Sequence, residues 1–215
     1  MADSGRWLTK LERKIGWLAV PQISILIVTL QALGFFAMSS SPAWFLRLAL
    51  IPERVMDGEL WRLITFLSIP LTMDPLWLFF SLWFLYFILN SLEQEWGAFK
   101  TTLYVLVSIV VTAVFSLAFG YPVTQARSFE STLFLAAAAL FPEYEVRVFL
   151  VLPVKLKWMG FLTGAFVLLQ FAQGAWMDRL YLVAMYFNFI VFFGPGVLQR
   201  LKSLYRRWDY RRKLR

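Results

Sequence analysis

Ser131 is the first residue to consider for chemistry, because a serine hydroxyl can act as a nucleophile when a neighbouring base removes its proton. The usual base is His, and the chain contains none. A Ser–Lys pair is the common substitute. The lysines nearest the apolar segments, Lys100, Lys155 and Lys157, flank the ends opposite Ser131 in the topology derived below. We therefore expect no serine hydrolysis, and a protein that is not an enzyme.

Two acidic residues near the predicted outer surface, Glu130 and Asp178, are the alternative source of chemistry. Two carboxylates can perform acid–base catalysis when their environments separate their pKa values. The sequence contains no motif that pairs them, so a hydrolase of this kind remains an alternative hypothesis. Glu130 at the start of a helix would suit the helix dipole. It could instead contact a client protein, or pair with Arg127 or Arg179.

Metal and cofactor chemistry finds little support in the composition. The chain has no Cys and no His, which removes disulfides, thiolate chemistry and the commonest metal ligands. We expect no metal site and no cofactor.

The elements that would position these residues are membrane helices. The chain is 60% hydrophobic and only 16% charged, and its mean hydropathy is +0.66. A soluble domain of this length needs more charge on its surface. Aromatic residues make up 19% of the chain, and Trp and Tyr are typical of the two membrane interfaces. The composition predicts an all-α polytopic membrane protein.

Six apolar segments support that prediction, at roughly 20 residues per membrane span. They cover about residues 15–38, 75–92, 101–119, 131–141, 157–177 and 180–198. The fourth is too short to cross a bilayer unaided, and its alanines favour burial among other helices. Gly160 and Gly164 in the fifth predict close helix packing. Polar residues in or near the segments predict hydrogen bonds between helices, or a hydrophilic cavity: Gln22, Gln31, Asn90, Gln170, Gln173 and Asn188.

Basic residues predict the orientation, because Lys and Arg accumulate on the cytosolic side. With six spans and a cytosolic N-terminus, eight basic residues of the tail 200–215 and eight others lie inside, and five lie outside. The other inner residues are Arg6, Lys10, Arg13, Lys14, Lys100, Arg147, Lys155 and Lys157; the outer ones are Arg47, Arg54, Arg62, Arg127 and Arg179. We expect a cytosolic N-terminus (1–14), a membrane domain (15–198) and a cytosolic tail (199–215).

The first outer loop, residues 39–74, contains apolar runs interrupted by single arginines, including Arg47 and Arg62. Such segments lie in the membrane interface with the apolar face towards the lipid. We expect Arg62 to hold the loop by bonding backbone carbonyls, or else to contribute to a client-docking surface. Glu93, at the inner end of the second segment, is expected to bond a helix end or a loop.

Three motifs resemble the rhomboid superfamily, in the family's order and spacing. Gly58, Trp61 and Arg62 resemble its Gly-x-x-Trp-Arg signature in the first loop, and Glu93 with Gly97 resembles its Glu-x-x-x-Gly at the end of the second helix. Phe141-Pro142 followed by residues 154–158 resembles its link between the fourth and fifth helices. The resemblance covers about residues 44–195.

The resemblance implies a six-helix bundle with a central fourth helix and an interfacial first loop. Active rhomboids use a Ser on the fourth helix and a His on the sixth. Alignment on Phe134 puts Glu130 at the nucleophile position, next to Ser131, without the flanking glycines. The sixth helix offers Met185 and Asn188 where the base would be. The chain therefore resembles an inactive rhomboid, a pseudoprotease in the sense of the derlins.

The expected function is to bind transmembrane segments of client proteins, between the second and fifth helices, in quality control, trafficking or assembly. The short fourth helix and the sunken loop would also thin the bilayer locally. A small transporter or channel is a further alternative, disfavoured by the few ionisable residues in the spans.

We expect no nucleic-acid partner, and the oligomeric state stays open. The bacterial inner membrane is favoured over the endoplasmic reticulum. Five basic residues of the tail are expected to bind anionic lipids: Arg206, Arg207, Arg211, Arg212 and Lys213.

Overall fold

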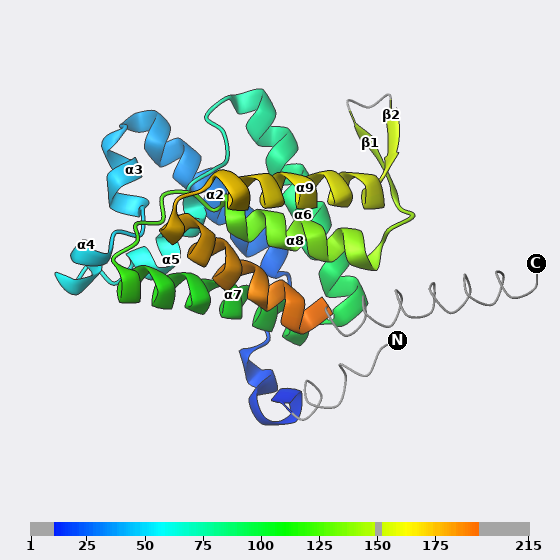
Figure 1. The fold of residues 1–215 in the computed structure, drawn as a ribbon, viewed down its shortest axis with the longest axis horizontal. Helices are drawn as coiled ribbons and strands as arrows, with labels where there is room; N and C mark the ends of the chain where they lie inside the picture. The colour runs from blue at the N-terminus through cyan, green and yellow to red at the C-terminus, as the bar shows by residue number, and fades with distance from the viewer. Residues whose placement is uncertain (1–10, 149–151, 194–215) are drawn as a thin grey trace, which may run out of the picture.

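A computed structural model describes residues 11–148 and 152–193 of the chain. It is mostly helical (Figure 1). The long helices are α2 (Ile23–Ser40), α6 (Pro75–Trp96), α7 (Ala98–Phe119), α8 (Arg127–Leu140), α9 (Leu156–Gln173) and a C-terminal helix, Trp176–Phe193. Each of these six helices overlaps one of the six apolar segments of the sequence, with ends that differ by up to several residues. The predicted lipid-binding residues Arg206, Arg207, Arg211, Arg212 and Lys213 lie outside the described residues.

Four of these helices are long and apolar enough to cross a membrane within the described part of the chain: α2, α6, α7 and the C-terminal helix. The protein is therefore a membrane protein with four candidate spans, and the expected bundle of six spans is not shown. α8 has 14 residues, so it is about 21 Å long at 1.5 Å per residue. The fourth segment is thus as short as the sequence predicts. α9 has 18 residues but is not among the four candidates.

The first helix begins later than its apolar segment. Residue 15 precedes a short 3-10 helix, η1 (Gly16–Leu18), and α2 starts only at Ile23. Pro21 and Gln22 separate the two, and Gln22 has a φ of 58°. Since a non-glycine residue in this left-handed region cannot continue a right-handed helix, hydrophobicity alone placed the start of α2 too early.

The second helix begins where the sequence indicates. Asp74 accepts hydrogen bonds from the backbone N–H groups of Leu76 (3.0 Å) and Trp77 (3.1 Å), and Pro75 occupies the first turn. An Asp cap followed by Pro is a favoured start for a helix, because Pro has no N–H group to leave unbonded.

The first loop, between α2 and α6, forms a layer of short helices at one end of the bundle. These are α3 (Ala43–Leu48), α4 (Pro52–Met56), α5 (Arg62–Thr65) and the 3-10 helix η2 (Phe66–Ser68). A β-hairpin of β1 (Glu145–Val148) and β2 (Leu152–Lys155) joins α8 to α9 at the opposite end (Figure 1). The two ends of the molecule therefore carry different structures.

Gly34 brings α2 and the first loop into close contact. A Cβ atom at this position would lie 1.8 Å from the carbonyl oxygen of Ser68 in η2. A second link joins Leu50 of the loop to Val123, between α7 and α8, through two backbone hydrogen bonds of 3.0 and 2.8 Å. The loop is therefore part of the packed structure, while Leu46, Met56 and other apolar side chains on it are exposed.

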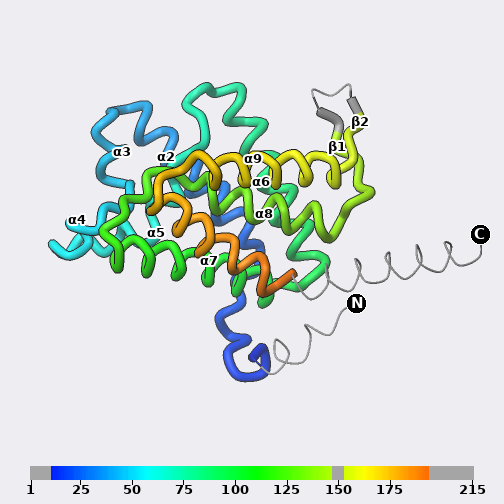
Figure 2. Tube along the Cα trace, viewed as in Figure 1, coloured from blue at the N-terminus to red at the C-terminus, as the bar shows by residue number. Residues whose placement is uncertain are grey.

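α8 occupies the interior of the bundle. Seven of its 14 residues are buried, and it packs against α6, α9 and the C-terminal helix. The trace in Figure 2 follows α8 from the end with the short loop helices to the end with the hairpin. A helix covered on several sides needs no long apolar run, which explains why its sequence is less hydrophobic than that of a typical span.

Candidate functional site

The N-terminal end of α8 brings a serine and a tyrosine together. The Ser131 Oγ and Tyr186 Oη atoms, the latter on the C-terminal helix, lie 2.6 Å apart. The Ser131 hydroxyl also donates to the backbone carbonyl of Ser128 at 2.9 Å. Because a hydroxyl carries only one proton, Ser131 donates to Ser128 and accepts from Tyr186.

This pair resembles a nucleophile with its base only in geometry. A phenol titrates near pH 10 in water, so at neutral pH it keeps its proton and acts here as the donor. The Ser131 proton is directed at a carbonyl, which is not a base. The arrangement therefore binds the hydroxyl in place without activating it.

The two residues expected at the base position, Met185 and Asn188, face α7. The Met185 sulfur accepts a hydrogen bond from Thr112 at 3.0 Å. Asn188 Nδ2 donates to the Tyr104 carbonyl (3.1 Å) and to the Ser108 hydroxyl (2.7 Å). Tyr186 was not among the residues predicted for the site. A tyrosine within an apolar segment could have indicated it, since a buried tyrosine hydroxyl usually finds a hydrogen-bond partner.

Glu130 lies in the first turn of α8 but contacts another helix. Its Oε1 atom accepts a hydrogen bond of 2.6 Å from Nε2 of Gln31 in α2. Glu130 is the acidic residue in the first turn of α8, the position that the helix dipole favours for a carboxylate, and its side-chain hydrogen bond crosses to α2. Within the described residues, neither Arg127 nor Arg179, the two partners that the sequence suggested, forms an ion pair with Glu130.

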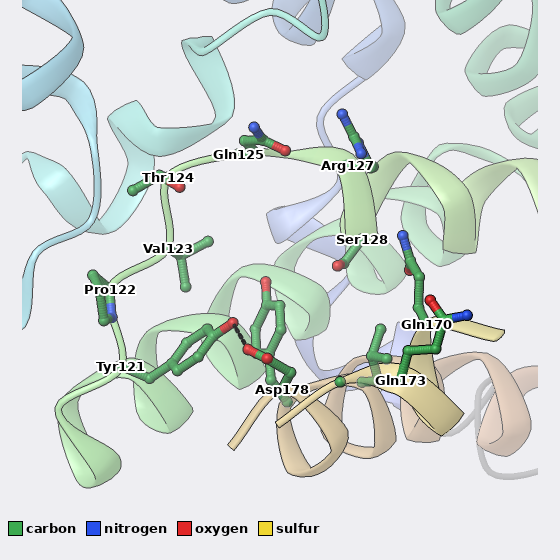
Figure 3. Close-up of a pocket in the computed structure, with 13 residues that line it drawn as sticks. Tyr121, Pro122, Val123, Thr124, Gln125, Arg127, Ser128, Gln170, Gln173 and Asp178 are labelled. Carbon is green, nitrogen blue, oxygen red and sulfur yellow. Dashed lines mark hydrogen bonds between the residues drawn. The ribbon is translucent and has the colours of Figure 1, made fainter. Parts of the chain in front are cut away.

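An open hollow of about 410 Å³ lies above this region, between the start of α8, the end of α9 and the start of the C-terminal helix (Figure 3). Its lining is mainly polar. Ser128, Gln170 and Gln173 face it, as do Tyr121 and Asp178. The two glutamines thus line a hydrophilic cavity, which is one of the two roles that the sequence left open for them.

Tyr121 and Asp178 close one side of the hollow. The Tyr121 hydroxyl donates to Asp178 Oδ1 at 2.7 Å, which Figure 3 marks with a dashed line. Asp178 Oδ2 accepts from the backbone N–H of Ala175 at 3.1 Å. Burial raises the pKa of Tyr121 above its ordinary value, and the hydrogen bond to Asp178 raises this pKa further. Tyr121 is therefore held as a neutral donor, and Asp178 is bound to partners other than Glu130.

The edge between α6 and α9 presents apolar side chains. α9 packs closely on α8, where a Cβ atom on Gly160 would lie 2.6 Å from Cβ of Ala138. Gly164 has no neighbour within 4 Å of its Cβ position, so only the first of the two predicted packing glycines makes a close contact. Seven large apolar residues on α9 are exposed: Trp158, Phe161, Leu162, Phe166, Leu168, Leu169 and Phe171. On α6 the exposed residues include Leu76, Phe79, Phe80, Trp83 and Tyr86.

Arg62 connects the short helices of the first loop. Its side chain is only 4% exposed, and its Nη1 atom donates to the carbonyls of Leu46 and Ala49, the latter at 2.7 Å. Its Nε atom donates to Glu59 at 2.7 Å. These are the carbonyl bonds expected of a loop brace. The neighbouring Trp61 is exposed.

The other motif residues lie at turns and at helix ends. Gly58 and Gly97 have φ values of +101° and +85°, which residues with a Cβ atom rarely adopt. Gly97 separates α6 from α7. Glu93 accepts a hydrogen bond of 2.7 Å from the backbone N–H of Gln22, before α2. The motif residues thus occupy positions that shape the backbone.

A charge cluster marks the hairpin end of the molecule. Glu143 accepts hydrogen bonds from Lys155 (2.8 Å) and Lys157 (2.6 Å). These bonds lower the pKa of Glu143 to about 2. On the acidic side, the contact therefore persists through the ordinary titration range of a glutamate and is lost as the pH falls towards about 2.

No group of three or more possible metal ligands occurs among the residues that the structure describes. Comparisons with known protein families, with curated proteins and with solved structures found no match for this chain.

Proposed function

We propose that this chain is a non-catalytic, rhomboid-like membrane protein that binds transmembrane segments of client proteins at the edge between α6 and α9. The observation that carries the proposal is the Ser131–Tyr186 pair, which lies one turn of α8 beyond Ser128 in the lining of the polar hollow. The pair joins α8 to the C-terminal helix one residue from Glu130 and one residue from Met185, the positions that the rhomboid resemblance gives to the nucleophile and to the base, and it offers a phenol where an active member has a base.

The rhomboid-like arrangement has further support in the order of the elements. Short helices follow α2, and a short, buried α8 contacts α6, α9 and the C-terminal helix. Gly58 and Gly97 adopt backbone angles that favour glycine at the two motif positions.

Binding at the α6–α9 edge has support in the way α9 is held. Only Leu156 and Gly160 of α9 are buried, so most of this helix is exposed around its contact with α8. A client helix can pack against such an apolar surface. The hollow at the outer end, with Gln170 and Gln173, offers hydrogen bonds to a polar residue of that client.

Local thinning of the bilayer belongs to the same proposal. A helix of 14 residues spans about 21 Å, against roughly 30 Å for the hydrocarbon core. A short element draws the lipid surfaces together. The exposed Leu46, Met56, Leu60 and Ile64 of the first loop would enter the interface at that place.

Site-specific photocrosslinking in native membranes tests client binding. A photoreactive residue replaces Trp83 on α6 or Phe166 on α9, which are 55% and 58% exposed, and Val114 on α7, which is 61% exposed, is the control. We expect crosslinks from α6 and α9, with crosslinked peptides that map to transmembrane segments of the captured proteins. Equal capture from Val114, or peptides from soluble regions only, would remove the support for this edge as the binding site.

A serine-reactive fluorophosphonate probe tests the absence of catalysis. We expect no labelling of Ser131, because its proton has no acceptor that is a base. Labelling of the native chain that disappears in Ser131→Ala would show an activated serine and would restore the hydrolase alternative.

A further inference from the structure

We infer that Gln31 and Glu130 form a carboxamide–carboxylic acid pair that binds a proton at neutral pH and links α2 to the outer end of α8. This inference goes beyond the proposed function and does not depend on it. The ligand is a single proton, taken from solvent and held between the Glu130 carboxyl group and the Gln31 amide.

Without that proton, the amide oxygen of Gln31 has no hydrogen-bond donor. Gln31 is 1% exposed, and its Nε2 atom donates to Glu130 Oε1 at 2.6 Å. Its Oε1 atom is buried and has no hydrogen-bond partner. A buried carbonyl oxygen without a donor is destabilising, so native structures rarely leave one in this state.

A proton on Glu130 supplies the missing donor. A carboxylic acid and a primary amide can exchange two hydrogen bonds: the amide N–H donates to the acid carbonyl, and the acid O–H donates to the amide oxygen. The first of these bonds is present. The second needs an O–H group, which only the protonated form of Glu130 has. An ionised carboxylate would instead leave the amide oxygen unsatisfied, beside a negative charge.

The charged groups on the surrounding helices do not neutralise an ionised Glu130 carboxylate. α2 contains no charged residue. Glu93 and Glu95 on α6, Lys100 on α7 and Lys157 on α9 lie at the opposite ends of their helices. On the C-terminal helix, Asp178 bonds to Tyr121, and Arg179 bonds to the Ala172 carbonyl.

Arg127 is the nearest cation on α8 itself, one turn before Glu130. Its side chain is exposed and lines the hollow, where water screens its charge. Glu130 is partly buried, and its hydrogen-bond partner is the neutral amide of Gln31. Withdrawing a carboxylate from water without a cation beside it is costly, and such groups take up a proton instead. Both the hydrogen bonding and the surroundings therefore favour the neutral acid.

Infrared spectroscopy of the full chain, labelled with isotopic glutamate and reconstituted in lipid nanodiscs, tests the inference. We expect a carbonyl band of a protonated carboxyl group at neutral pH, absent from Glu130→Gln and retained in the matched control Glu95→Gln, since Glu95 is exposed. Gln31→Leu should shift the band to higher frequency, because the amide no longer accepts the O–H. Three results would overturn the inference: no such band in the native chain, a band that persists in Glu130→Gln, or a band whose frequency does not change in Gln31→Leu.

Thermal unfolding gives a second, independent measurement. Folding of the native chain binds a proton, so its midpoint should fall as the pH rises above the ordinary range of a glutamate. Glu130→Gln keeps a neutral hydrogen-bonding pair at every pH and should reduce this slope, whereas Glu95→Gln should not. Equal slopes for the native chain and Glu130→Gln would contradict a bound proton.

Discussion

At the scale of single residues, the hydrogen bonds of buried polar groups decide what the chain can do. The Ser131 hydroxyl is occupied by Ser128 and Tyr186, and Glu130 by Gln31. Neither side chain is left as a free reactive group. Arg62 has a structural role. Its guanidinium group donates to the carbonyls of Leu46 and Ala49, which have no partner within their own short helix.

Arg62→Ala should therefore destabilise the protein. The substitution leaves the carbonyls of Leu46 and Ala49 without a donor, at about 1–3 kcal/mol for each buried group. We expect the free energy of unfolding in detergent to fall by about 2–4 kcal/mol. Arg62→Lys should recover only part of this loss, because Lys lacks the planar set of donors.

The matched control is Arg54→Ala. Arg54 is exposed and lies 3.9 Å from Glu59, so its loss should change the free energy of unfolding by no more than about 0.5 kcal/mol. Similar effects of the two substitutions would argue against a specific role for the carbonyl bonds of Arg62.

At the scale of the elements, close backbone contact fixes the position of the first loop. The helix α2 passes η2 at Gly34 with no space for a side chain, and the bridge between Leu50 and Val123 joins the loop to the start of the α8 region. A short helix such as α5 has little stability by itself. The loop therefore depends on its contacts with the bundle for its structure.

Gly34→Ala should displace the loop from the bundle. The new methyl group would lie 1.8 Å from the Ser68 carbonyl oxygen, so either α2 or η2 must move. We expect a loss of about 1–3 kcal/mol, typical of overpacking, together with faster hydrogen exchange in residues 43–68. Gly164→Ala is the control, because open space surrounds that position. It should be neutral, or should stabilise α9 by up to about 1 kcal/mol through helix propensity. Unchanged exchange in Gly34→Ala would contradict the contact.

At the scale of the whole molecule, two ends of different character enclose an apolar body. Short helices and the polar hollow lie at one end, and the hairpin with the Glu143–Lys155–Lys157 cluster lies at the other (Figure 1). Basic residues accumulate on the cytosolic side of membranes. The hairpin end is therefore expected inside the cell and the loop end outside.

Single cysteines can test this orientation, since the chain has none of its own. Met56 on α4 and Glu145 on β1 are both exposed. We expect an impermeant maleimide to label Met56→Cys in intact cells, and to label Glu145→Cys only after permeabilisation. The reverse pattern would invert the proposed topology, and labelling of both in intact cells would contradict opposite locations.

The sequence by itself determined the class of the protein and the approximate limits of its helices. Apolar length and period are local properties, so the segments 75–92 and 101–119 match α6 and α7 within a few residues. The same is true of the short α8 and of the start of α6 at Asp74 and Pro75. The absence of His from the chain is likewise a property of composition.

Only the tertiary structure decided which side chains meet. The rotation of the C-terminal helix turns Tyr186 towards Ser131 and turns Met185 and Asn188 towards α7. Hydrophobicity carries little information about this rotation, because lipid and protein interior are similarly apolar. The Gln31–Glu130 pair and the crossing at Gly34 join residues 99 and 34 positions apart. Such contacts depend on how the helices pack, and that packing cannot be read from any one segment.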